Sequence, residues 1–141
     1  MSSLEKRAWL MLWSMCPVFL AYFTVQYAFP NLLPDFKARL ICLAIVAGAH
    51  AVIYLTGWLV MKRQEAGQSL LEDERDHAID ARATRAAYFI LISGMILVGV
   101  VMPFDSSGWK ITNGALLFIV LSEAVRYALI VIGYRRPRLA H

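Results

Sequence analysis

The fold is decided by residues 86–104, which read AAYFILISGMILVGVVMPF and contain no charged side chain. A bilayer's hydrocarbon core is about 30 Å thick, and roughly 20 helical residues cross it. This run is therefore long enough for a transmembrane helix. Three other runs match it in length and apolar character, and we predict spans at residues 8–29, 40–61, 86–104 and 111–134.

The composition of the chain agrees with a membrane location. Its 141 residues are 60% hydrophobic, and the mean hydropathy is +0.58. A soluble domain of this length has no core large enough to bury so much apolar surface. Four spans leave almost no residues for a soluble domain, so we predict one domain, residues 1–141. The basic start at Met1–Arg7 precedes a run that is too long for a cleaved signal peptide, so we expect a retained first helix.

The lysines and arginines predict the orientation, because they favour the cytoplasmic side. Ten lie on the side that holds both termini and the middle loop, and three lie on the other side at Lys37, Arg39 and Lys110. We therefore predict a multi-pass membrane protein with both termini and the middle loop in the cytoplasm. The net charge of +4 is read as a signal of topology, and nucleic-acid binding is not expected.

Short turns connect the predicted spans on the outer side. Residues 30–35 contain Pro30 and Pro34, which end one helix and begin the return, and residues 105–108 read DSSG. Short connections make neighbouring helices antiparallel. The predicted fold is therefore all-α, an up-down-up-down bundle of four transmembrane helices. Cys16 and Cys42 fall at different depths within these helices, so we expect free thiols.

The charged residues are concentrated between the second and third spans, where residues 62–85 hold eleven of the 24. Ser69 and Glu72 form a capping box, which predicts a helix from about Leu70 into the third span. On it, an acidic face is expected at the i, i+3, i+4 and i+7 positions Asp73, Asp76, His77 and Asp80. A basic face lies roughly opposite, at Arg75, Arg82 and Arg85. Neither face has enough oppositely charged residues three or four positions away on the same helix to pair with. The helix is therefore either a surface that docks a second copy or another protein, or a charged helix exposed to water.

The same segment carries a resemblance to a family. Its residues Asp73-Glu74-Arg75-Asp76, then Ile79, then Arg82-Ala83 resemble the D-E-R-D-x-x-I-x-x-[KR]-A signature of small bacterial four-helix membrane proteins of unknown function. The resemblance covers the motif and the helix layout, and it implies no established activity. Some members of this group look like companions of small helix-turn-helix regulators, which implies a role in signalling or immunity.

Among the polar residues inside predicted spans, His50, Glu123 and Arg126 are the candidates for a functional site. A charged side chain near the bilayer centre costs at least about 2.5–3.5 kcal/mol. We expect Glu123, near the middle of the fourth span, to pair with Arg126 one turn away, and Arg126 to extend towards the cytoplasm. His50 is expected at a similar depth. Three interpretations stay open: structural hydrogen bonding between helices, a proton or ion path, or a ligand pocket.

Metal binding and catalysis are not expected. Cys16-Pro17 with Met11 and Met15 has soft donors of the kind that suit copper(I), but a helix kink and packing account for them. His77 with its neighbouring aspartates fits a solvated acidic face better than a cation site. We therefore predict no metal and no cofactor.

The sequence contains no phosphate loop, no Ser/His/Asp arrangement and no cysteine-pair zinc motif, so an enzyme is not expected.

With the bacterial origin that the resemblance implies, we predict a multi-pass protein of the bacterial inner membrane. We expect it to be a non-enzymatic regulatory, accessory or immunity-type protein that docks a cytoplasmic protein or a second copy as a homodimer. The residues expected to dock the partner are Asp73, Glu74, Arg75, Asp76, Asp80 and Arg82. The alternative is a small oligomeric transporter or channel that uses His50, Glu123 and Arg126.

Overall fold

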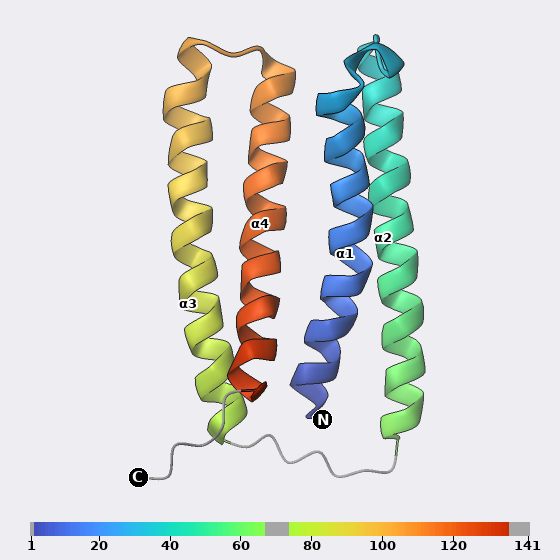
Figure 1. Cartoon of the computed structure of the whole chain (residues 1–141), viewed down its shortest axis with the longest axis vertical. Coiled ribbons are helices and arrows are strands. Elements are labelled where there is room, and N and C mark those ends of the chain that lie inside the picture. Colours follow the sequence, from blue (N-terminus) through green and yellow to red (C-terminus); the bar gives the residue numbers. More distant parts are fainter. Residues whose placement is uncertain (1, 67–73, 136–141) are drawn as a thin grey trace. The chain divides into compact units, whose positions relative to one another are not determined.

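The computed structural model describes residues 2–66 and 74–135. Within these residues the chain is helical and forms no strand. The four long helices are α1 (Ser3–Ala28), α2 (Phe36–Glu65), α3 (Glu74–Ile96) and α4 (Gly108–Arg135) (Figure 1). Among the described residues, all four are long and apolar enough to cross a membrane, with α3 counted through Phe104. The predicted all-α fold with four candidate spans is confirmed.

The two predicted turns are present as short connections. Between α1 and α2 the 3-10 helix η1 (Pro30–Leu32) reverses the chain, and Arg39 Nε donates to the carbonyl of Leu33 at 2.8 Å. After α3 the chain continues through the π-helical turn η2 (Leu97–Val101) and the 3-10 helix η3 (Met102–Phe104) before α4 begins. Each turn therefore closes a helical hairpin.

The chain consists of two compact units, one of residues 9–69 and one of residues 1–8 with 70–141. The first contains the hairpin of α1 and α2. Its helices meet through apolar and aromatic side chains: Leu10 packs on Gly57, and the ring of Phe19 meets His50 edge to face at 5.8 Å between centroids. Pro17 lies inside α1, and Cys16 and Cys42 are free thiols, as predicted.

The second unit contains the hairpin of α3 and α4, whose backbones approach closely at glycines. The Phe118 side chain of α4 lies directly on Gly94 of α3. Nearer the far end of the hairpin, a Cβ at Gly133 would lie 2.9 Å from Cγ2 of Ile79. These two contacts fix which residues of the antiparallel helices lie opposite each other.

The charged residues from Glu74 to Arg85 belong to the helix of the third span, because α3 starts at Glu74 and continues without a break into the apolar run. The predicted continuity is thus confirmed. The expected capping box at Ser69 and Glu72, the helix start near Leu70, and Asp73 lie outside the described residues.

Candidate functional site

An ion pair joins α3 to α4 near the charged end of their hairpin. Arg126 Nη2 donates to Asp80 Oδ1 at 3.1 Å, and the two side chains are 30% and 37% exposed. Glu123, the predicted partner, contributes a weaker electrostatic attraction to Arg126. The expected local pair is therefore wrong as the main contact: Arg126 uses a carboxylate from the neighbouring helix.

This pairing changes the expected depth of Arg126. In the register set by the Gly94–Phe118 and Ile79–Gly133 contacts, the backbone of Arg126 lies opposite Ala86, the first residue of the third apolar run. Its side chain extends from there towards the charged end to reach Asp80, as predicted for a long cation at a membrane boundary. Arg126 thus lies level with the start of the third apolar run, and Glu123 about one turn further along that run.

Residues of the D-E-R-D motif make further contacts with the end of α4. The Tyr134 hydroxyl donates to Asp76 Oδ1. Arg75 makes a long hydrogen bond of 3.5 Å to the carbonyl of Gly133, and its guanidinium carbon lies 5.7 Å from the centre of the Tyr134 ring. Ala83, the last residue of the motif, is buried. We call these interactions, with the Ile79–Gly133 contact and the Asp80–Arg126 pair, the motif contacts.

The motif contacts supply partners from α4 for an acidic face that is short of local partners on its own helix. Asp76 and Asp80 are half-buried against α4, and Arg75 is half-buried as well. Of the predicted docking residues, Glu74 and Arg82 are exposed, and Asp73 lies outside the described residues. Sequence spacing on one helix identified the acidic face, but it could not show that α4 covers this face.

The residues that the sequence argument missed lie on α4. Neither Tyr134 nor Gly133 was among the residues expected to form a site. Both lie in an apolar stretch, residues 127–134, which reads YALIVIGY. The register of the hairpin could have identified them. In an antiparallel hairpin with its turn at residues 105–108, counting outward along both helices brings residues 127–134 beside the motif.

His50 lies in the other unit and has aromatic neighbours. Besides Phe19, the ring of Tyr54 is 6.3 Å away between centroids. Its Nδ1 atom is buried and has no hydrogen-bond partner among the described residues. His50 thus packs as a ring in the α1–α2 hairpin.

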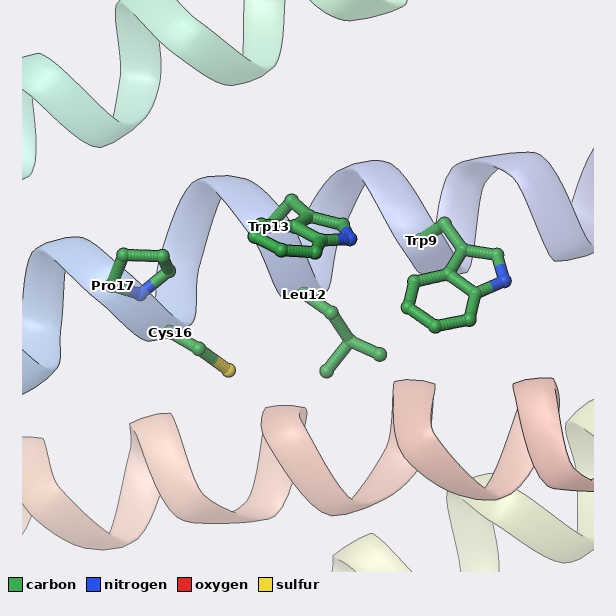
Figure 2. A pocket seen from close by; sticks show the side chains of 5 residues that line it. All are labelled: Trp9, Leu12, Trp13, Cys16 and Pro17. Atoms are coloured by element: carbon green, nitrogen blue, oxygen red, sulfur yellow. The ribbon is translucent and has the colours of Figure 1, made fainter.

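Two pockets on the α1–α2 unit are apolar. One of about 240 Å³ is formed along α1 by the side chains shown in Figure 2: Trp9, Leu12, Trp13, Cys16 and Pro17. Another of about 390 Å³ is lined by residues 33–46. Across the described residues, no group of three or more His, Cys, Asp or Glu side chains is placed to hold a metal ion.

Comparison with known proteins gives one match. Residues 32–138 match the model of a family described as "Predicted membrane protein (DUF2178)". The matched range is about three quarters of the chain and includes α2, the α3–α4 hairpin and every motif contact. No curated protein and no solved structure matches significantly.

Proposed function

The chain belongs to the DUF2178 family of predicted membrane proteins, and we propose that it is a non-enzymatic regulatory or accessory protein of the bacterial inner membrane. In this proposal both termini lie in the cytoplasm, and the N-terminal part of α3 docks a cytoplasmic protein.

The observation that carries this proposal is the division of α3 into two faces. One face is held on α4 by the motif contacts. The other exposes Glu74, His77, Ala78 and Ala81, which we call the docking patch. Because α3 is fixed along its α4 side, a partner would meet a preorganised surface, which lowers the cost of binding. The two alanines leave room for a close approach, and Glu74 and His77 add polar specificity.

The non-enzymatic part of the proposal is supported by the polar side chains between α3 and α4, which form hydrogen bonds and an ion pair within the hairpin. Asp76, Asp80, Arg126 and Tyr134 are engaged with one another, so their hydrogen-bonding capacity supports the hairpin. A group that acts on a substrate needs to be accessible to it in a cleft.

The transport alternative loses support from the same contacts. It relied on Glu123 and Arg126 as a costly pair near the bilayer centre. Asp80 neutralises Arg126 across the hairpin. A charged residue in this apolar helix is therefore explained by its partner on α3, and it needs no role in transport.

Photo-cross-linking in living cells tests the docking proposal. A photo-reactive residue at Ala78 or Ala81 should give a discrete adduct, and Glu74→Lys should reduce its yield. The matched control carries the reactive residue at Phe104, which is 89% exposed at the other end of the hairpin and should give no such adduct. An adduct of twice the chain mass would identify a second copy as the partner. Absence of any adduct from the docking patch would refute the proposal.

A further inference from the structure

A continuous stripe follows the docking patch along the outer face of α3. Arg82, Arg85, Phe89, Ile92 and Ile96 are spaced i, i+3, i+7, i+10 and i+14, so they lie on one face of the helix. Both arginines are exposed. The three apolar side chains are 63%, 40% and 56% exposed. We call these five residues the outer stripe: two cations at one end and an apolar track at the other.

Within residues 2–66 and 74–135, the two arginines of the outer stripe have no neutralising group. Among the described residues no hydrogen bond or ion pair involves Arg82 or Arg85. The carboxylates of Asp76 and Asp80 lie on the opposite face and are engaged by α4. Glu74 shares the outer face, but it lies eight residues before Arg82, about 12 Å along the helix at 1.5 Å per residue. An anion is therefore the complementary ligand.

The position of the arginines indicates which anion. Arg85 directly precedes Ala86, where the apolar run begins, and Arg82 is one turn further out. Arg126, whose backbone lies opposite Ala86, marks the same boundary on α4. Cations at this level meet the phosphate groups of the lipid leaflet, and the apolar track runs from them into the hydrocarbon region.

We propose that the outer stripe binds an anionic phospholipid of the leaflet that faces the docking patch. The guanidinium groups of Arg82 and Arg85 hold the headgroup phosphate, because their planar donor sets match phosphate oxygens in a bidentate manner. One acyl chain lies along Phe89, Ile92 and Ile96. The arginines and the hydrocarbon track recognise the two ends of the same molecule.

Lipid binding to the purified full chain tests this inference without any protein partner, so its outcome is separate from that of the docking proposal. The chain in detergent is titrated with phosphatidylglycerol or phosphatidylcholine, and bound lipid is counted by native mass spectrometry. Each arginine near an anionic surface changes binding about fivefold, so R82Q/R85Q should weaken phosphatidylglycerol binding by about 25-fold. Phosphatidylcholine binding should change little.

Two control variants decide the interpretation. K37Q/K110Q removes the same charge from two exposed lysines at the other ends of the helices and should leave phosphatidylglycerol binding within twofold. R82K/R85K keeps the charge but loses the planar bidentate donors, so its preference for phosphatidylglycerol over phosphatidylcholine should fall between that of R82Q/R85Q and that of the unaltered chain. A retained partial preference also shows that the altered chain still folds. Equal losses in R82Q/R85Q and K37Q/K110Q would overturn the inference. Displacement of the lipid by millimolar inorganic phosphate would overturn it too, because the ligand would then be a soluble anion.

Discussion

The helices within each of the two hairpins are held together by different kinds of interaction. The helices α3 and α4 combine close glycine contacts with an ion pair and hydrogen bonds at the charged end. The contacts described above between α1 and α2 are apolar and aromatic, namely Leu10 on Gly57 and Phe19 on His50. In lipid, apolar side chains gain little from meeting each other, and packing and polar contacts carry specificity. The α3–α4 hairpin therefore has the more strongly specified register.

The largest expected effect comes from filling Gly94. A Cβ there would overlap the Cβ and Cγ atoms of Phe118, which can move only if the helices separate. Overpacking of this kind typically costs 1–3 kcal/mol, and we expect Gly94→Ala to lower the free energy of unfolding by about 2 kcal/mol, measured by denaturation in mixed micelles. Gly48→Ala is the matched control, because nothing lies within 4 Å of a Cβ at Gly48. Equal stability of the two variants would contradict the close α3–α4 approach.

A smaller effect is expected from the ion pair. Asp80→Asn should destabilise the chain by about 1 kcal/mol, as expected for a half-exposed charged pair. Combined with Arg126→Gln in a double-mutant cycle, it should show a coupling of similar size. Glu123→Gln is the control and should couple more weakly to Arg126→Gln. If Glu123 couples as strongly as Asp80, the cross-helix pair is not the main partner of Arg126.

The smallest effect is expected in the α1–α2 hairpin, at Gly57. A Cβ there overlaps the terminal methyl groups of Leu10, and a flexible side chain can rotate away. We therefore expect Gly57→Ala to change the free energy of unfolding by less than about 0.5 kcal/mol, with helix propensity offsetting part of the overlap. A loss as large as that of Gly94→Ala would mean that both hairpins are equally tightly packed, and the contrast between them would fail.

Sequence alone predicted the four spans, because apolar runs of about 20 residues are a direct physical requirement of the bilayer. The helices extend past these runs: α2 continues to Glu65, and α3 includes the charged residues from Glu74. Hydropathy reports how readily a segment transfers to lipid. It does not detect the polar residues by which a helix continues beyond the apolar run. The helix boundaries were therefore less accurate than the spans.

The partner of Arg126 could not be read from one helix. Spacing rules compare residues three or four apart, and by that rule Glu123 was the natural choice. Asp80 is 46 residues away in sequence, and it reaches Arg126 only because the hairpin has one particular register. For the same reason, Asp76 was expected to face a partner protein but contacts Tyr134.

The Asp80–Arg126 pair has a consequence for biogenesis. Asp80 is synthesised before Arg126. When the fourth helix reaches the insertion machinery, the third helix therefore already carries a carboxylate that can neutralise Arg126. The third and fourth helices are therefore suited to enter the bilayer together as a preassembled hairpin. A fourth helix expressed by itself would present Arg126 to the translocon without its main counterion.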